Sequence, residues 1–249
     1  MSLSLRLLID GPLDGPTNMA IDSCLLERAQ AQGAGFLRLY RWTLPTLSLG
    51  YFQRFADIAG QGPLLASLPV VRRCTGGGAI LHAEELTYCL ALPLAHGLAG
   101  DRPETLYTWM HQRIAQAVRT LGGQTRDGAD CPASLNPRGG PFLCFACHAR
   151  FDLLAGPDKL AGSAQRRTRA GVLQHGSVVL RRSHPVQPSA AMADMLGREV
   201  SFDELAGAIL AAVGQAGVAL TAPAPSQVEA EAFARQHSQY ADDAWTRRR

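Results

Sequence analysis

The chain has 249 residues, a net charge of +3, 47% hydrophobic residues and 18% charged residues. This size and composition predict one globular domain with a sizeable core. The balanced charge gives no general affinity for nucleic acid, and no run of about eighteen apolar residues predicts a membrane span. Because the N-terminus lacks the form of a signal peptide, the six cysteines are expected as reduced thiols of a cytoplasmic protein.

Basic residues gather locally in three runs, at residues 166–169, 181–182 and 247–249. A solvated surface is the ordinary interpretation of such runs. An acidic protein partner is the alternative interpretation.

Hydrophobic periodicity and turn residues predict strands and helices in irregular alternation. Thr17 or Asn18 is expected to cap a helix that reaches Gln32 and ends at Gly33, and a proline opens a second helix over residues 103–121. The order of elements predicts an α+β fold over residues 1–249, with a mixed or antiparallel sheet flanked by helices. The expected strands are residues 3–9, 36–42, 47–52, 70–73, 79–82, 86–92, 159–165 and 171–180, and residues 188–249 are expected to be helical with a break at residues 221–225.

The first segment that points to chemistry runs from Arg72 to His82 and holds three consecutive glycines between two expected strands. Glycines permit positive φ angles and let backbone N–H groups approach a ligand, while paired arginines can hold a phosphate or a carboxylate. The loop matches neither a dinucleotide-binding nor a Walker motif. From its residues alone it is either a strained hairpin or an anion- or acyl-binding loop.

The second segment is a C-x-x-C-H sequence from Cys144 to His148. Covalent haem attachment needs export, for which there is no signal peptide, and zinc would need further ligands such as Cys131 and His175, whose spacing is not diagnostic. No metal site is therefore expected. A cysteine near a histidine is also the minimal arrangement for a thiolate nucleophile, and buried structural cysteines remain the alternative.

The third segment begins at Lys159 and continues to Gln165, and after a turn residues 173–177 follow. The small residues beside Lys159 leave room for a ligand, and a lysine ammonium can polarise a carbonyl or stabilise an adjacent thiolate. A solvated lysine at the end of a strand is the alternative.

Together these segments resemble the superfamily of lipoate–protein ligases and octanoyltransferases, which includes the biotin–protein ligases. The resemblance implies the biotin/lipoate–protein ligase catalytic fold as a single domain, without the C-terminal accessory domain that many ligases carry. The matching blocks follow the same order as in that superfamily. They are residues 18–22, 38–42, 45–53, 72–88, 144–145 and 159–177.

Within the superfamily the chain is most similar to LipM-type octanoyltransferases, in which an essential cysteine precedes a lysine strand. The Cys-Phe pair, the acidic-Leu pair and the lysine motif of that type correspond here to segments that begin at Cys144, Asp152 and Lys159. The resemblance implies that Cys144, rather than Cys147, is the nucleophile and that Lys159 is the second catalytic residue. It implies substrate-binding roles for Arg72, Arg73, Thr75, Gly76, Gly77, Gly78, Ala79, His82, Gly162, Ser163, Gln165, His175 and Gly176.

The implied reaction moves an octanoyl or lipoyl group onto a specific lysine in two steps. Cys144 takes the group from acyl carrier protein or from a lipoyl protein as a thioester, and a lysine of a lipoyl-domain protein (glycine cleavage H protein or E2 type) then attacks that thioester. Since amide formation is downhill, no cofactor is expected. Lys159 and the backbone of the glycine loop would stabilise charge. The acyl chain is expected in an apolar tunnel along Leu49, Gly50, Tyr51, Ala79 and Leu81.

Two departures bear on an alternative. Gly78 stands where the LipM type often has arginine and where ATP-dependent ligases have glycine, which keeps a ligase open. Ala83 stands where ligases and many transferases have aspartate, which argues against a ligase. An ATP-dependent lipoate–protein ligase would form lipoyl-AMP from ATP, with magnesium, at the glycine loop, and Cys144 would be dispensable. A non-catalytic acyl-binding relative is a further alternative.

Overall fold

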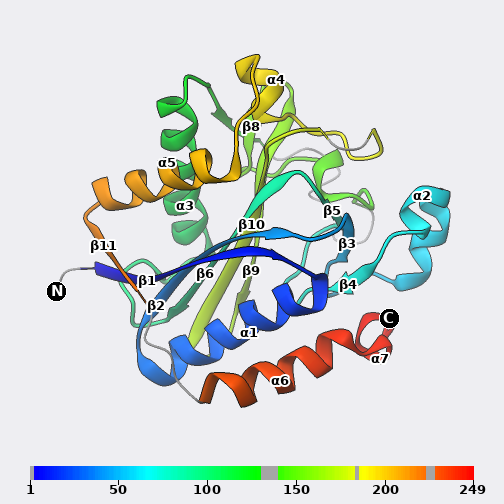
Figure 1. Cartoon of the computed structure of the whole chain (residues 1–249), viewed down its shortest axis with the longest axis horizontal. Helices are drawn as coiled ribbons and strands as arrows, with labels where there is room; N and C mark the ends of the chain where they lie inside the picture. The colour runs from blue at the N-terminus through cyan, green and yellow to red at the C-terminus, as the bar shows by residue number, and fades with distance from the viewer. Residues whose placement is uncertain (1–2, 130–139, 183–184, 223–227) are drawn as a thin grey trace.

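The computed structural model of the chain describes residues 3–129, 140–182, 185–222 and 228–249 (Figure 1). At its centre lies an eight-stranded sheet in the order β11-β1-β2-β6-β10-β9-β8-β7. β1 runs parallel to both of its neighbours, and every other neighbouring pair in this sheet is antiparallel. The strands are β1 (Leu3–Leu13), β2 (Gly35–Trp42), β6 (Glu85–Pro93), β7 (Arg126–Asp127), β8 (Leu153–Ala155), β9 (Asp158–Arg167), β10 (Gly171–Val179) and β11 (Val218–Thr221).

Helices cover both faces of this sheet, so the predicted α+β fold with a mixed sheet is confirmed (Figure 1). One face carries α1 (Gly15–Gln32), with α6 (Val228–Ala241) packed against it. The other face carries α3 (Pro103–Thr120) and α5 (Phe202–Gln215), which contact each other. No described helix is long and apolar enough to cross a membrane.

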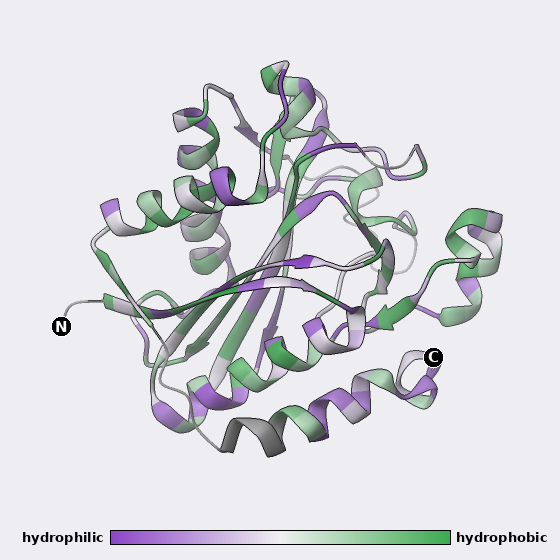
Figure 2. Cartoon of the chain, in the orientation of Figure 1, coloured by the Kyte–Doolittle hydropathy of each residue, from purple (hydrophilic) through white to green (hydrophobic). Residues whose placement is uncertain are grey.

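The strands divide their side chains between the two faces with the period of two that a pleated strand requires. On β6, Leu90 and Leu92 join the core under α3 and α5, whereas Cys89 and Ala91 face α1. Figure 2 shows the hydrophobic residues on the central strands and on the inner sides of the helices. The strand is buried on both faces, and this is why its sequence is an almost continuous apolar run.

A second sheet of three strands stands beside the first in the order β4-β3-β5. The glycine loop connects β4 to β5, and the 3-10 helix η1 with the short helix α2 connects β3 to β4. These elements are β3 (Thr46–Leu49), β4 (Val70–Arg72), β5 (Ile80–His82), η1 (Phe55–Gln61) and α2 (Pro63–Ala66). The remaining ones are α4 (Met192–Leu196), α7 (Asp243–Thr246) and η2 (Cys144–Ala146).

The first helix ends at Gly33 as predicted, with φ at 64°. Its predicted start is wrong: the helix begins at Gly15, because the Asp14 side chain accepts a hydrogen bond from the N–H of Thr17 at 2.8 Å. Asn18 is engaged elsewhere and donates to the carbonyls of Leu13 and Arg41. The Asp14 cap was missed because the helix begins several residues before the first apolar residue of its periodic pattern.

The prediction of helix after residue 188 is wrong for residues 218–221, which form β11. This strand pairs in parallel with β1 from the opposite end of the chain. Partners so far apart in sequence leave no local signal, and the pairing overrides the local preference. The predicted strand over residues 47–52 also ends early, at Leu49.

The C-terminal helices are tied to the loop after β3 through a buried arginine. The guanidinium of Arg72 donates to the carbonyls of Gly50 at 2.9 Å, Gln53 at 2.6 Å and Thr246 at 2.8 Å. Trp245 donates its indole N–H to the carbonyl of Arg72 at 2.8 Å. Arg72 therefore joins three segments that are far apart in sequence, and its side chain is fully buried.

Replacing Arg72 with leucine should reduce the free energy of unfolding by roughly 3 kcal/mol, because carbonyls that accept from a charged donor would lose it. The exposed Arg54→Leu variant, which loses only a surface ion pair, should change stability by less than about 1 kcal/mol. Urea unfolding and hydrogen exchange at residues 243–246 measure both effects. An Arg72→Leu variant as stable as wild type would indicate that this arginine serves a ligand rather than the fold.

Candidate functional site

Cys144 and Lys159, predicted from distant segments, lie in contact. The Lys159 Nζ atom is 3.3 Å from Cys144 Sγ and 2.8 Å from Asp152 Oδ2. Lys159 is buried, whereas Cys144 is partly exposed. The Asp152 carboxylate also accepts the N–H of Ala149 at 2.7 Å, which holds it in place. The ammonium thus lies between a carboxylate and a thiol.

The charge of Lys159 is maintained despite its burial. Burial lowers its pKa, but the neighbouring Cys144 and Asp152 outweigh that effect and raise the pKa above the ordinary lysine value. The side chain is therefore an ammonium at neutral pH. Because it is only 4% exposed, the alternative of a solvated lysine is wrong.

The glycine loop holds the backbone of the cysteine. Cys144 donates its N–H to the carbonyl of Ala79 at 2.7 Å, and Ala79 donates to the carbonyl of Phe142 at 2.7 Å. A Cβ atom on Gly78 would lie 2.9 Å from the Cys144 nitrogen and 3.1 Å from its Cα. A side chain at position 78 would therefore displace the backbone of Cys144.

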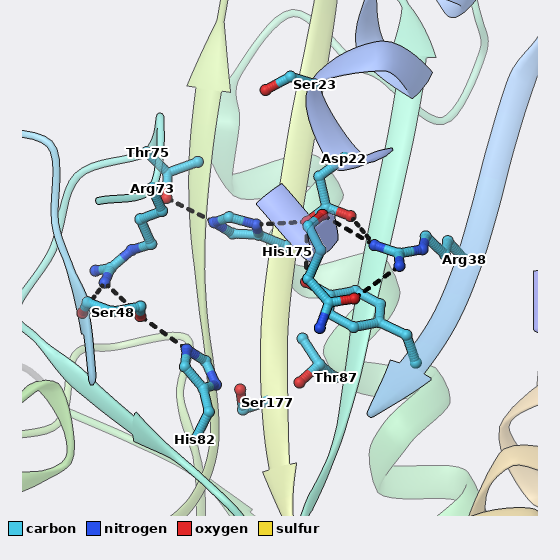
Figure 3. Close-up of polar contacts among 12 residues, drawn as sticks. Asp22, Ser23, Arg38, Ser48, Arg73, Thr75, His82, Thr87, His175 and Ser177 are labelled. Carbon is cyan, nitrogen blue, oxygen red and sulfur yellow. Dashed lines mark hydrogen bonds and ion pairs between the residues drawn. The ribbon is translucent and has the colours of Figure 1, made fainter. Parts of the chain in front are cut away.

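Arg73 shapes the same loop from beneath. Its guanidinium donates to the carbonyls of Gly76 at 2.7 Å and Gly78 at 2.6 Å. It also donates to the carbonyl of Ser48 at 2.9 Å (Figure 3). Its Nε atom is buried and has no hydrogen-bond partner in the described part of the chain. Arg73 therefore holds the carbonyls of the glycine loop, whereas Arg72 lies in the fold contacts given above. Substrate binding by both arginines stays a prediction.

A small internal cavity lies between the glycine loop, α1 and β10. Its lining includes four of the predicted substrate-binding residues, Arg73, His82, His175 and Gly176, which the fold brings together from separate segments. The side chains of Met19, Tyr40 and Ile80 form an apolar wall of the cavity. The cavity holds about 20 Å³, room for about one water, so its lining side chains would have to move apart before an acyl chain could enter.

The predicted tunnel along Leu49, Ala79 and Leu81 is wrong. Those three side chains pack into a closed hydrophobic cluster with Leu47. Ile80 instead faces the cavity, because alternate residues of a strand point to opposite faces. The prediction therefore chose the wrong face of β5.

His175 connects the cavity to a buried charge pair. Its Nδ1 atom lies 3.0 Å from Asp22 Oδ2 and its Nε2 atom 2.7 Å from the Thr75 hydroxyl, while Arg38 pairs with Asp22 at 2.8 Å (Figure 3). Burial lowers the pKa of His175 despite the Asp22 carboxylate, so the ring is neutral at neutral pH. The neutral ring donates to Asp22 and accepts from Thr75. These bonds hold Thr75, which is the residue directly before the three glycines.

Asp22 and Arg38 were not predicted as site residues. Burial raises the pKa of Asp22, but the hydrogen bond from His175 and the charge of Arg38 outweigh it, so the carboxyl is held below its usual range. The sequence did contain a signal for this pair. Asp22 and Arg38 each stand at a position where the pattern of the helix or the strand predicts burial, and a fully buried charge needs a partner.

His82 is held by a separate set of contacts. Its Nε2 atom lies 2.7 Å from the Ser48 hydroxyl, its Nδ1 atom 2.5 Å from Glu85, and its ring stacks on Trp42 with centroids 3.9 Å apart. Glu85 also accepts from the Ser177 hydroxyl at 2.9 Å. The two histidines of the cavity are thus fixed in orientation from opposite sides of the loop.

A chain of hydrogen bonds ends next to Asp152. Gln174 donates its amide to the Tyr88 hydroxyl at 2.7 Å, Tyr88 lies 2.5 Å from the Ser163 hydroxyl, and Ser163 lies 2.6 Å from His111 Nε2. The Nδ1 atom of His111 bonds the carbonyl of Phe151. Since a carbonyl only accepts and an amide N–H only donates, both hydroxyls donate toward His111 and the ring proton sits on Nδ1.

The direction of these hydrogen bonds requires a neutral His111 ring, and the burial of His111 agrees with a neutral ring. Burial lowers its pKa, although the Phe151 carbonyl and the Asp152 charge oppose that effect. Phe151 immediately precedes Asp152, so the chain anchors the backbone of the residue that pairs with Lys159. His111 was missed, and the signal was a histidine on the buried stripe of α3.

The C-x-x-C-H segment does not act as a unit. Cys147 is disulfide-bonded, so the expectation of reduced cysteines is wrong there, since composition cannot exclude an individual bond. His148 Nδ1 lies 2.5 Å from the carbonyl of Ala129. Cys131, the suggested zinc ligand, lies outside the described residues. Within the described ranges no group of three or more His, Cys, Asp or Glu side chains is arranged to hold a metal.

Replacing Gly162 with alanine should separate Lys159 from Cys144, because a Cβ at position 162 would lie 2.2 Å from Lys159 Cε. Because the cation would no longer contact the Cys144 sulfur, alkylation of Cys144 by iodoacetamide, mapped by mass spectrometry, should slow about tenfold. Gly207→Ala, in open space on α5, is the matched control and should alkylate at the wild-type rate. Unchanged alkylation in Gly162→Ala would show that this contact does not control the thiol.

Two substitutions of His111 should distinguish its hydrogen bond to Phe151 from its hydrogen bond to Ser163. Asparagine keeps a donor near the position of Nδ1, for Phe151, whereas glutamine reaches only toward Ser163. We expect His111→Asn to keep the wild-type rate of Cys144 alkylation by iodoacetamide and His111→Gln to slow it, because only asparagine still bonds the backbone beside Asp152. Equal rates in the two variants, with equal melting temperatures, would contradict a positioning role.

Comparison with known proteins agrees with this geometry. Residues 14–196 match the family model of the lipoyl protein ligase A/B catalytic domain. An octanoyltransferase LipM of Oceanobacillus iheyensis is 39% identical over 171 residues, which cover 68% of this chain and 61% of that protein, less than two thirds of its length. An octanoyltransferase LipM of Symbiobacterium thermophilum is 32% identical over 286 residues and covers 100% of both chains.

Solved structures share the fold. The chain resembles the bi-partite lipoate protein ligase of Thermoplasma acidophilum, described with its E2 lipoyl domain, with a TM-score of 0.73 and 18% identity over 98% of this chain and 96% of that one. At this identity the likeness concerns the fold alone. The family match and the LipM relatives show more: the chain belongs to the lipoyl protein ligase A/B catalytic domain family.

Proposed function

We propose that the protein is an octanoyltransferase of protein lipoylation that carries the acyl group on Cys144. The observation that carries this proposal is the buried ammonium of Lys159 at 3.3 Å from the Cys144 sulfur. A cation at this distance stabilises a thiolate, and the thiolate is the nucleophilic form. An enzyme that activates its acid as an adenylate needs no thiol beside its lysine. The LipM relatives support octanoyl as the acyl group.

In the first step the Cys144 thiolate attacks the thioester carbonyl of the donor. A new sulfur–carbon bond forms, the donor thiolate leaves and takes up a proton, and Cys144 is left as a thioester. Lys159 also lies near the reacting carbonyl and can donate to the developing oxyanion. In the described part of the chain no acceptor is bonded to the N–H groups of Gly77 and Gly78, so these donors are available for the same oxyanion.

In the second step the amine of the acceptor lysine attacks the Cys144 thioester. An amide bond forms, the Cys144 thiolate leaves, and the proton released from the amine goes to the thiolate or to solvent. A thioester is a higher-energy acyl compound than an amide, so the transfer proceeds without ATP, magnesium or another cofactor.

The acyl chain is proposed to enter at the small cavity beneath the glycine loop and to widen it, since the cavity of about 20 Å³ holds about one water. Met19, Tyr40 and Ile80 would contact its methylene groups, and each buried methylene contributes about 0.8 kcal/mol. Gly176 lines it without a side chain, because a Cβ there would lie 2.3 Å from the Ser163 hydroxyl.

The proposed donor is acyl carrier protein, and the proposed acceptor is a lipoyl-domain protein of the glycine cleavage H or E2 type. The names of the relatives and of the Thermoplasma ligase solved with its E2 lipoyl domain support the acyl group and the class of acceptor. We place the reaction in the cytoplasm, and neither nucleic acid nor membrane has a part in it.

A second candidate is an ATP-dependent lipoate–protein ligase. Two observations favour it: the third glycine of the loop, and a lipoate-protein ligase A bound with ATP that matches the fold with a TM-score of 0.78 at 20% identity, over 98% of this chain and 99% of that one. In that case Arg73 and the glycine loop would bind the phosphate of the adenylate. A non-catalytic acyl-binding relative would carry out neither reaction.

Incubation with octanoyl carrier protein should add one hydroxylamine-sensitive octanoyl group to Cys144, detected by intact mass and peptide mapping. Cys144→Ser should lose transfer to a lipoyl-domain protein by about a thousandfold or more, because the hydroxyl is not activated by a cation that suits a thiolate. Cys147→Ser, which leaves the nucleophile in place, should lose far less. Full activity of Cys144→Ser together with dependence on ATP would establish the ligase instead.

A further inference from the structure

Two basic runs that are far apart in sequence meet around Tyr51. The guanidinium carbon of Arg248 lies 3.7 Å from the centroid of the Tyr51 ring, and that of Arg249 lies 5.5 Å from the centroid of Phe52. Arg166, on β9, acts at the same place: the hydrogen bond and the charge of Arg248, then Arg166 and Arg249, lower the pKa of Tyr51. We term Tyr51, Phe52, Arg166, Arg248 and Arg249 the basic rim.

The arginines of the basic rim are exposed and, within the described ranges, none forms an ion pair with an acidic side chain. Their neighbours differ. Arg54 pairs with Asp57 at 2.7 Å, and Arg247 pairs with Asp243 at 3.2 Å. Phe52 is 68% exposed beside them. Unneutralised guanidinium groups next to an exposed aromatic ring create a positive surface that attracts an anionic partner.

The basic rim borders the glycine loop on the side away from the nucleophile. Tyr51 donates its N–H to the carbonyl of Thr75 at 2.8 Å, and the Phe52 ring lies 3.8 Å from where a Gly76 Cβ would be. At the other end of the loop Gly78 contacts the backbone of Cys144. The basic rim and the thiol therefore flank the same three glycines, and a partner on the rim is next to the site.

We propose that the basic rim docks the acidic carrier protein that delivers the acyl thioester to Cys144. This inference rests on the proposed function. Guanidinium groups match both the carboxylates of an acidic surface and the phosphodiester that joins the thioester arm to a carrier protein. The acceptor instead presents a lysine, which is a cation until it is deprotonated, and a positive rim repels it. The charge of the rim therefore fits the donor.

Charge reversal of the rim tests this assignment. In Arg166→Glu and Arg248→Glu, acylation of Cys144 by octanoyl carrier protein should slow at least about tenfold at low salt and lose its salt dependence. Acylation by a small uncharged octanoyl thioester should match wild type, which shows that the site is intact. Arg248→Lys should keep most of the rate. Arg119→Glu, an exposed change of equal charge on α3, is the matched control and should leave both rates unchanged.

Three outcomes would overturn the docking proposal. The first is wild-type acylation of both variants by the carrier protein. The second is a loss confined to transfer from the acylated enzyme to a lipoyl-domain protein, which would assign the rim to the acceptor. The third outcome concerns binding alone. If neither donor acylates wild-type Cys144, the proposed function itself fails, and the affinity for the apo carrier protein is then measured by calorimetric titration. Equal affinities of wild type and Arg248→Glu would show that the carrier protein does not dock on the rim.

Discussion

The buried ammonium of Lys159 is the constraint on which the rest of the site depends. Removing such a charge from water costs several kcal/mol unless it is paired and hydrogen-bonded, and here Asp152 and Cys144 supply that environment. The neighbouring features follow from this requirement: Gly162 leaves room for the lysine side chain, and the hydrogen bonds of His111 hold the backbone beside Asp152. The same arrangement places a cation against the Cys144 sulfur, and a cation there stabilises a thiolate.

The glycine loop is held by one cation that binds its carbonyls and by two neutral partners. Arg73 bonds the loop from below, His175 holds Thr75 at its start, and the backbone of Ala79 bonds that of Cys144. Free N–H groups in a loop that is already fixed can stabilise an oxyanion without reorganising during the reaction. Arg73, one of the two arginines that resembled an anion site, therefore shapes the loop through its carbonyls.

The fold by itself does not separate a transferase from a ligase. Lipoate ligases share it at 18% and 20% identity with TM-scores of 0.73 and 0.78, while relatives named as octanoyltransferases share 32% to 39% of the sequence. A common fold hosts different chemistries, and function must be argued from the site. Here the distinguishing group is the Cys144 thiol, which only covalent acyl transfer requires.

The sequence by itself determined the α+β class, the end of the first helix at Gly33, and the identity of Cys144 and Lys159 as the residues to examine, because caps, periodicity and motif spacing are local properties of a chain. Only the tertiary structure decided which face of β5 lines the cavity, that residues 218–221 pair with β1, and that Arg72 serves the fold. It alone brought His111 to Asp152 and two basic runs to Tyr51. These features depend on strand pairing and burial between distant segments, which no local pattern encodes.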